Sequence, residues 1–258
     1  MLECWIAFRH KRSTLLGIPF RVNMRFLFPS PAPMNDIICT VDVVLMTLKD
    51  SRLHVALLKR DHAPFAGLPA LPGGYIRAAE DGDTQAAAAR MLREKTGIDS
   101  PYLEQLATFS GRERDPRGWS LSVAYYALVP HELIERAGHP EVTLLPVDKV
   151  GELPFDHAHI VAAAVQRVRN KSSYSSLPVY LCGDSFTLPQ LQAVYEAILG
   201  EPINKVSFRR KMEELDMVEP VAGAMETGKA HRPAQLYRLR ECYSRNLSLT
   251  DRALNAKG

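Results

Sequence analysis

The sequence predicts an α+β fold in which an α/β sandwich domain is followed by a separate helical module of about 70 residues. Between residues 37 and 155, short runs rich in β-branched residues alternate with turns and enclose one helical segment. From residue 186 onward, apolar residues recur at helical spacing in two short segments that a glycine and a proline separate. These two patterns predict two structural units in one chain.

The composition is that of an ordinary globular protein, with 258 residues, 46% hydrophobic and 24% charged. A net charge of +3 is too small to indicate nucleic-acid binding, so such a function must be argued from local charge. The four cysteines form no C-x-x-C pair, which favours reduced thiols in a cytoplasmic protein. No apolar run approaches the roughly 20 residues that cross a bilayer, so no membrane partner is expected.

Residues 1–33 stand apart from the predicted domain, because residues 9–12 are basic and only Glu3 is acidic. An arginine-rich, acid-poor start is one feature of a transit peptide. We favour a disordered extension, or an over-long gene prediction whose real start is Met34, since the core pattern begins immediately after it.

The first domain is expected to contain strands and one helix. The strands are expected at residues 37–48, 53–58 and 121–129, with a further short strand within 141–155. Residues 61–74 hold three prolines and three glycines and predict a loop. Asp83 or Thr84 caps a helix that runs to Lys95, and Gly97 terminates it.

A second helix is expected at 158–170, and the polar residues 172–178 predict a linker. The resulting division is residues 34–155 as a ligand-binding domain, 156–180 as a linker helix and linker, 181–245 as the helical module and 246–258 as a tail.

Residues 73–98 read GGYIRAAEDGDTQAAAARMLREKTGI and follow a Leu-Pro pair. They resemble the Nudix box, G-x5-E-x7-R-E-U-x-E-E-x-G-U, where U is aliphatic, although the spacer before the arginine is nine residues instead of seven. The matching positions are Gly74, Glu80, Arg90, Leu92, Glu94, Gly97 and Ile98. The resemblance implies a Nudix α/β/α sandwich.

In the Nudix family, three glutamates of this box bind divalent metal against a pyrophosphate. Their places are taken here by Met91, Glu94 and Lys95, so two carboxylates are missing and one has become a cation. Mg²⁺ requires oxygen ligands, which a thioether and an ammonium do not supply. We therefore expect no catalytic residue and no required cofactor. If magnesium binds at all, Glu80 and Glu94 would hold it, although Glu94 is equally suited to pair with Arg90 one helical turn away.

Residues 112–119 read RERDPRGW and resemble the D-P-R-G stretch of Nudix proteins that handle ADP-ribose. Arginine forks pair bidentately with phosphate, and the tryptophan offers an aromatic face. The expected ligand-binding residues are Arg60, Gly73, Gly74, Glu80, Arg114, Asp115, Arg117, Gly118 and Trp119. The alternative is a charged hairpin loop that is only solvated.

The C-terminal module has the pattern of a winged helix-turn-helix. Thr187 caps a first helix, which Gly200 and Pro202 end, and a second helix runs from residue 204 or 205 to Leu215. Two short strands around residues 217–218 and 235–239 would form a wing with a basic tip. In such folds the second helix enters the major groove of DNA. The alternative is a surface-charged helical hairpin.

A damaged Nudix box, the DPRGW run, FTLP-x-L at 186–191, FRRK at 208–211 and RPA-x-LY at 232–237 together resemble the NrtR family of bacterial Nudix-related repressors of NAD metabolism genes. The resemblance implies a homodimer on a palindromic double-stranded DNA operator, with an ADP-ribose-type nucleotide that changes DNA affinity. The expected DNA-contacting residues are Lys205, Ser207, Arg209, Arg210, Lys211, Lys229, His231 and Arg232.

Two other functions remain open at this point. One is a magnesium-dependent ADP-ribose pyrophosphatase with a variant metal site, in which Asp81 or Asp83 joins Glu80 and Glu94. The other is a scaffold whose C-terminal module binds a protein. Substitution of Arg209 and Arg210 by alanine distinguishes the scaffold from a DNA-binding protein, because it should leave DNA binding unchanged if the C-terminal module binds a protein.

Overall fold

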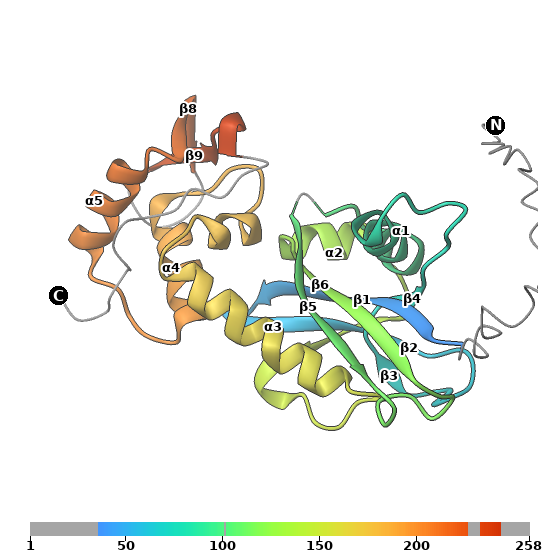
Figure 1. Ribbon diagram of the computed structural model, residues 1–258. Coiled ribbons are helices and arrows are strands. Elements are labelled where there is room, and N and C mark those ends of the chain that lie inside the picture. Colours follow the sequence, from blue (N-terminus) through green and yellow to red (C-terminus); the bar gives the residue numbers. More distant parts are fainter. Residues whose placement is uncertain (1–35, 101, 227–232, 244–258) are drawn as a thin grey trace, which may run out of the picture. The chain divides into compact units, whose positions relative to one another are not determined.

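The computed structural model describes residues 36–100, 102–226 and 233–243. Within this part of the chain, seven strands form one mixed sheet, drawn from blue to yellow-green in Figure 1. The strands are β1 Ile38–Lys49, β2 Arg52–Lys59, β3 Pro69–Ala70, β4 Gly73–Tyr75, β5 Leu103–Gly111, β6 Ser120–Leu128 and β7 Val142–Pro146.

The strand order is β3-β2-β1-β6-β5, with β4 also paired to β1 and β7 to β2. Strands β1 and β6 are parallel, with Val41 opposite Val123, whereas the other pairs are antiparallel. The middle of β1 is buried from Val41 to Thr47 because both faces of the sheet are covered.

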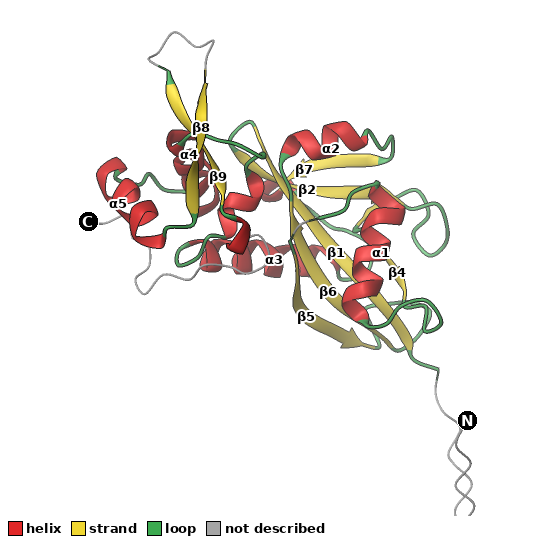
Figure 2. Ribbon diagram, turned by 90° about the horizontal axis from the view of Figure 1, so that it is seen from above, coloured by secondary structure: helices red, strands yellow, loops and turns green. Residues whose placement is uncertain are grey.

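Helices cover both faces, as the layers in Figure 2 show. Alternate residues of a strand point to opposite faces, so Val43 and Leu45 pack against α1 (Thr84–Thr96) and α2 (His131–Ala137). Val44 and Met46 point to the other face and pack in a second hydrophobic cluster, to which α3 (His157–Ser172) contributes. The structure thus has the α/β/α sandwich that the sequence predicted.

The expected elements of this domain are confirmed with small shifts at their ends, which is ordinary for helix and strand boundaries. Asp83 caps α1 by accepting a hydrogen bond from the Ala86 amide at 2.7 Å, and Gly97 ends the helix. The sequence missed β5 and α2, and residues 61–74, which were expected to form a loop, contain the short strand β3 and the start of β4. Strand β5 has a bulge and mostly exposed or half-buried side chains, and α2 has only seven residues, so neither has a strong period.

The segment expected as a linker is packed against the sandwich. Helix α3 contributes Ile160, Ala164 and Val168 to the core, so it is one layer of the sandwich. After it, Tyr174 is exposed, but Ser175, Ser176 and the following 3-10 turn at Leu177–Leu181 are buried. Its serines mislead a composition argument, because the Ser175 hydroxyl donates to the Lys171 carbonyl at 2.6 Å and so satisfies backbone groups inside the protein.

The C-terminal part is a winged helix-turn-helix, as predicted. It comprises α4 Leu188–Leu199, α5 Lys205–Leu215, β8 Val218–Glu226 and β9 Ala234–Leu239. A capping box at Thr187 starts α4, and Asn204 starts α5 by accepting from two backbone amides at 3.0 Å. The helices share a core in which the rings of Tyr195 and Phe208 meet edge to face, 5.5 Å apart.

The predicted basic tip of the wing lies at residues 227–232, outside the described residues. The strands on either side of it pair as expected, with Val218 opposite Leu239. No helix among the described residues is long and apolar enough to cross a membrane.

Candidate functional site

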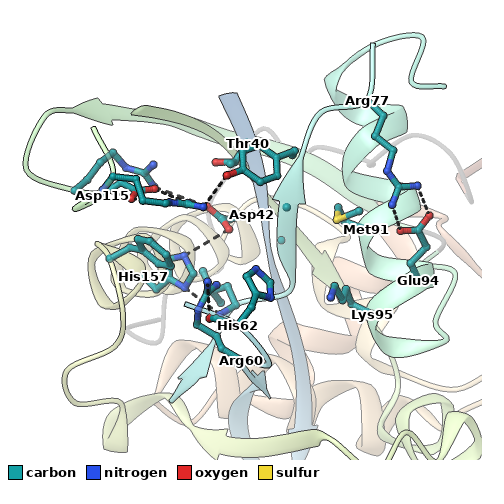
Figure 3. Close-up of a pocket in the computed structure, with 17 residues that line it drawn as sticks. Thr40, Asp42, Arg60, His62, Arg77, Met91, Glu94, Lys95, Asp115 and His157 are labelled. Carbon is teal, nitrogen blue, oxygen red and sulfur yellow. Dashed lines mark hydrogen bonds and ion pairs between the residues drawn. The ribbon is translucent and has the colours of Figure 1, made fainter. Parts of the chain in front are cut away.

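A cavity of about 400 Å³ opens between α1, the start of α3 and the loops that follow β2 and β5 (Figure 3). Its size suits a nucleotide-sized ligand. It is lined by Thr40, Asp42, Arg60, His62, Leu71, Gly73, Gly74, Tyr75, Arg77, Met91, Glu94, Lys95, Arg114, Asp115, Arg117, Phe155 and His157. The lining is rich in arginine, and charged groups of both signs face the cavity.

The polar floor of the cavity is built around Asp42, which β1 places on the face covered by α3. Only 6% of Asp42 is exposed, and its Oδ2 accepts a hydrogen bond from the Ser122 hydroxyl at 2.6 Å. Arg114 lies 3.8 Å from the same oxygen and donates two bonds to Asp156 at 2.8 and 3.0 Å. A buried carboxylate is stable here because it is hydrogen-bonded and has a cation beside it.

His157, the first residue of α3, stands beside Asp42 with its ring orientation set by the backbone. The Leu71 amide donates to its Nδ1 at 3.0 Å, so the proton of the neutral ring is on Nε2, which lies 3.5 Å from Asp42 Oδ1. Burial lowers the pKa of His157, and the nearby Asp42 opposes this effect. The ring is therefore a neutral donor toward the cavity floor near neutral pH.

The DPRG loop forms one wall of the cavity through an internal salt bridge. Asp115 is 3% exposed, and it accepts bonds from Arg117 Nη2 at 2.6 Å and Nε at 3.0 Å. Arg117 also donates to the Tyr75 hydroxyl at 2.6 Å, which joins this loop to β4. Hydrogen bonding to Asp115 raises the pKa of Arg117. Gly118 follows with φ at +151°, a conformation that favours glycine.

Strand β4 forms the second wall of the cavity, where it lies directly against β1 and α1. A Cβ on Gly73 would lie 2.1 Å from Asp42 Oδ1, and one on Gly74 would lie 2.7 Å from the sulfur of Met91. Gly73 is required by this close approach, because a Cβ there would also lie 2.7 Å from the Val41 carbonyl oxygen, whereas the contact at Gly74 is with the flexible end of Met91. Met91 is 4% exposed and fills the space behind β4 with apolar atoms.

The acidic residues near the Nudix box are all held by arginines or by the backbone. Arg77 donates to both oxygens of Glu94 at 3.0 and 3.2 Å and to Glu80 at 2.9 Å. Arg90 donates twice to Asp81 at 2.7 Å, which lowers the pKa of Asp81 to about 2, and its contact with Glu94 at 3.3 Å is the pair predicted from sequence. Glu80, Asp81 and Glu94 thus each accept hydrogen bonds from at least one guanidinium.

The residues present do not fit the magnesium site that the Nudix fold implies. Of the three box positions, only Glu94 offers an oxygen, and Met91 and Lys95 line the cavity beside it. Asp83, a ligand in the alternative metal arrangement, instead caps α1. Within the described ranges, no group of three or more His, Cys, Asp or Glu side chains is placed to hold a metal.

The structure brings together six of the nine expected ligand-binding residues, namely Arg60, Gly73, Gly74, Arg114, Asp115 and Arg117. Glu80, Gly118 and Trp119 do not line the cavity. Glu80 belongs to the Arg77 cluster, Gly118 shapes the backbone turn, and Trp119 is 40% exposed and accepts a backbone bond from Ile38 at 3.1 Å.

The sequence did not predict several residues that line the cavity. Tyr75 and Arg77 lie inside the box at positions that its pattern leaves open, and Asp42, Phe155 and His157 lie outside both motifs. A charged residue inside the apolar run of β1 was a signal for Asp42, because an unpaired charge is costly in a core. For the others only the chain path brings distant residues together; for example, Arg60 Cζ lies 4.9 Å from the centre of the Phe155 ring.

The expected DNA-contacting residues of α5 lie at the start and along the outer side of this helix. Lys205, Ser207, Arg209 and Arg210 are exposed, while Lys211 is half-buried and pairs with Glu214 at 3.5 Å. Lys229, His231 and Arg232 lie outside the described residues. Val206 is 76% exposed between them, an unusual position for a branched apolar side chain.

This fold defines a Nudix domain joined to a DNA-binding winged helix. Residues 39–166 match the family profile described as the NUDIX domain, and residues 178–239 match the NrtR DNA-binding winged helix domain. The chain is 42% identical over 216 residues to the ADPR responsive transcriptional repressor NtrR of Acinetobacter baylyi, covering 82% of this chain and 83% of that protein. The chain therefore belongs to the NrtR family.

Two further comparisons bear on the fold and on activity. The structure of Shewanella oneidensis NrtR complexed with a 27mer DNA matches with a TM-score of 0.78 and 38% identity, over 84% of this chain and 99% of that chain. The ADP-ribose pyrophosphatase of Methanocaldococcus jannaschii is 31% identical over 114 residues, which are 44% of this chain and 65% of that protein.

Proposed function

We propose that this protein is a ligand-gated, DNA-binding transcriptional repressor of NAD metabolism genes, and that its Nudix domain binds ADP-ribose or a closely related nucleotide. The proposal rests on two features found in one chain. The first is a nucleotide-sized cavity that is lined by arginines and, among the described residues, has no set of magnesium ligands. The second is a winged helix whose α5 is exposed and basic. The NrtR family relationship supports the same function.

The DNA-binding part of the proposal rests on α5. Its N-terminal residues are exposed and basic, whereas Phe208, Met212 and Leu215 anchor the opposite side in the core. Basic side chains beside a groove-binding helix contact phosphates and set its position on the duplex. A homodimer on a palindromic operator is part of the proposal, because helix-turn-helix proteins commonly bind as dimers to two half-sites about one helical turn apart.

The ligand-binding part rests on the cavity. A diphosphate carries charge that guanidinium groups recognise well, and an adenine ring needs the apolar and aromatic surface that Phe155 and Tyr75 provide. The Acinetobacter relative is described as an ADPR responsive transcriptional repressor. We propose that no metal cofactor is required and that the domain does not cleave its ligand.

An electrophoretic mobility shift assay tests the function. The purified full-length chain is titrated onto DNA from the upstream regions of NAD metabolism genes, with and without ADP-ribose, at low salt. We expect a shifted band whose midpoint moves when ADP-ribose is added. Coupling is reciprocal, so DNA must change the affinity for ADP-ribose by the same factor. No shift on any of these DNAs contradicts the proposal.

The alternative function is a magnesium-dependent ADP-ribose pyrophosphatase, which the similarity to the Methanocaldococcus enzyme favours. It would need Glu80 and Glu94 to leave Arg77 and bind a metal together. Cleavage of ADP-ribose by the wild-type protein, dependent on Mg²⁺ and abolished by Glu94→Gln, would establish this activity.

A further inference from the structure

The cations around the cavity fall into two groups. Three arginines are already neutralised by carboxylates. The pairs are Arg77 with Glu94 at 3.0 Å, Arg114 with Asp156 at 2.8 Å, and Arg117 with Asp115 at 2.6 Å. Arg60 and Lys95 line the same cavity, and neither makes an ion pair with a described residue. The cavity therefore holds two positive charges that form no close ion pair with a described residue, although the carboxylate of Asp61 is near enough to attract both.

Lys95 projects into the cavity from α1, one helical turn after Met91 (Figure 3). It faces the side of the cavity that carries His62 and Arg60. Its side chain is half-buried, and the buried Met91 makes the neighbouring wall apolar. An ammonium in such surroundings interacts more strongly with an anion than it would in open water.

Arg60 is held in place from the other side of the cavity. Its Nε donates to the Pro64 carbonyl at 2.8 Å, and its guanidinium lies over the Phe155 ring, with Cζ 4.9 Å from the ring centre. These contacts leave Nη1 without a hydrogen bond to any described residue. Burial and the positive charge of Arg117 lower the pKa of Arg60, and the carboxylates of Asp61, Asp42 and Asp115 only partly oppose this effect, so a bound anion would favour the charged guanidinium further.

We propose that Lys95 and Arg60 form a metal-free anion clamp, which binds the diphosphate of the ligand between them. In this arrangement the Lys95 ammonium has the electrostatic role that a divalent cation has in metal-dependent Nudix enzymes. The inference rests on the proposed function and adds the means of recognition. It explains together why two box carboxylates are replaced and why one replacement is a cation aimed into the cavity.

The anion clamp has a consequence for regulation. Binding through an ammonium needs no metal, so the sensor responds to its nucleotide at any magnesium concentration. The ammonium also supplies no metal-activated water, so the bound ligand is retained intact.

Isothermal titration calorimetry of the full-length protein with ADP-ribose tests the clamp, once in EDTA and once in magnesium buffer. We expect wild-type affinity to agree within about twofold between the two buffers. Lys95→Met, which keeps the length of the side chain but removes its charge, should weaken binding about 10- to 100-fold, the range of a charge-assisted hydrogen bond. Lys95→Arg should restore most of the affinity.

Arg93→Ala is the matched control, because Arg93 is a cation on the same helix that pairs with Asp99 at 2.7 Å and does not line the cavity. It should bind ADP-ribose as wild type does. Inorganic pyrophosphate should compete with ADP-ribose on the wild-type protein and compete less well on Lys95→Met. The thermal unfolding midpoint of each variant shows whether it is folded.

Binding of ADP-ribose that requires magnesium, or a Lys95→Met variant that binds as tightly as wild type, would overturn the clamp and leave the repressor function standing. No binding of ADP-ribose in either buffer would contradict both the clamp and the proposed sensor.

Discussion

Arg77 and Glu94 form a two-point ion pair beside the cavity, in which one guanidinium donates to both carboxylate oxygens at 3.0 and 3.2 Å. The two side chains are 44% and 39% exposed, so the pair is worth only about 0–1 kcal/mol. Arg77 therefore does not by itself exclude a metal from Glu94. The exclusion comes from the missing carboxylates at Met91 and Lys95, since one exposed glutamate is a poor site for Mg²⁺.

This relationship predicts the outcome of an activity assay. The wild-type protein should release no AMP from ADP-ribose when magnesium is added, and Glu94→Gln should behave in the same way because no metal-bound water is formed. Chromatographic measurement of AMP over a long incubation checks both. A magnesium-stimulated rate in the wild type that disappears in Glu94→Gln contradicts the expectation.

His157 predicts a pH dependence of stability. Burial lowers the pKa of His157 in the folded protein. The neutral ring therefore contributes its full stability above the pKa of the unfolded protein, about 6.5, and this contribution is lost as the pH falls through the lower pKa of the folded protein. His157→Leu leaves the Leu71 amide without an acceptor and should cost about 1–3 kcal/mol at about pH 8. The gap between wild type and variant should shrink toward about pH 5.

Urea unfolding of both proteins across this pH range measures the gap. His62→Leu, a change at an exposed histidine, is the control and should leave the pH profile close to that of wild type. A gap that stays constant or widens on acidification would show that His157 is not held neutral.

Arg209 predicts a change in the salt dependence of DNA binding. It is exposed near the start of α5 and forms no ion pair with a described residue, so its charge is free to contact a phosphate. Arg209→Ala should weaken binding to all DNA sequences and reduce the slope of log K against log salt by about 1. Fluorescence anisotropy at a series of salt concentrations measures the slope.

The control for Arg209 is Arg169→Ala, which removes an exposed arginine from α3 in the Nudix domain. An unchanged slope in Arg209→Ala, equal to that of the control, would favour the scaffold in which the C-terminal module binds a protein.

The exposed position of Val206 predicts an apolar contact with a DNA base. It is 76% exposed at the second position of α5, where residues of a recognition helix reach base edges. A branched apolar side chain there is suited to the thymine methyl group. Val206→Ala removes two side-chain carbon atoms and should weaken operator binding by about 4- to 15-fold, at about 0.8 kcal/mol for each carbon atom that the contact buries.

A loss of operator affinity should likewise appear when the wild-type protein binds an operator in which uracil replaces thymine, because uracil lacks the methyl group. The two changes should not add when combined at the contacted base. Full additivity at every thymine of the operator would rule out this contact.

The order of the longer strands and helices could be predicted from sequence, although β3, β4, β5 and α2 could not, because the longer elements have strong local signals. Asp83 and Gly97 mark the ends of α1, Thr187 and Gly200 mark those of α4, a run of β-branched residues marks β1, and a run of apolar and aromatic residues marks β6. The box and the DPRG run also predicted five residues of the cavity lining, and Arg60 after β2 was the sixth. These features are local, so they can be read without knowing which segments touch.

The sequence by itself therefore determined that this is a Nudix sandwich followed by a winged helix, and that its metal-binding positions are occupied by Met91 and Lys95. Only the tertiary structure decided that Asp42, His157 and Arg60 share one cavity, since β1, α3 and β2 bring them together across long stretches of chain. It also decided which charges are neutralised. Ion pairing depends on distances of a few ångströms between distant residues, and no spacing along the chain specifies those distances.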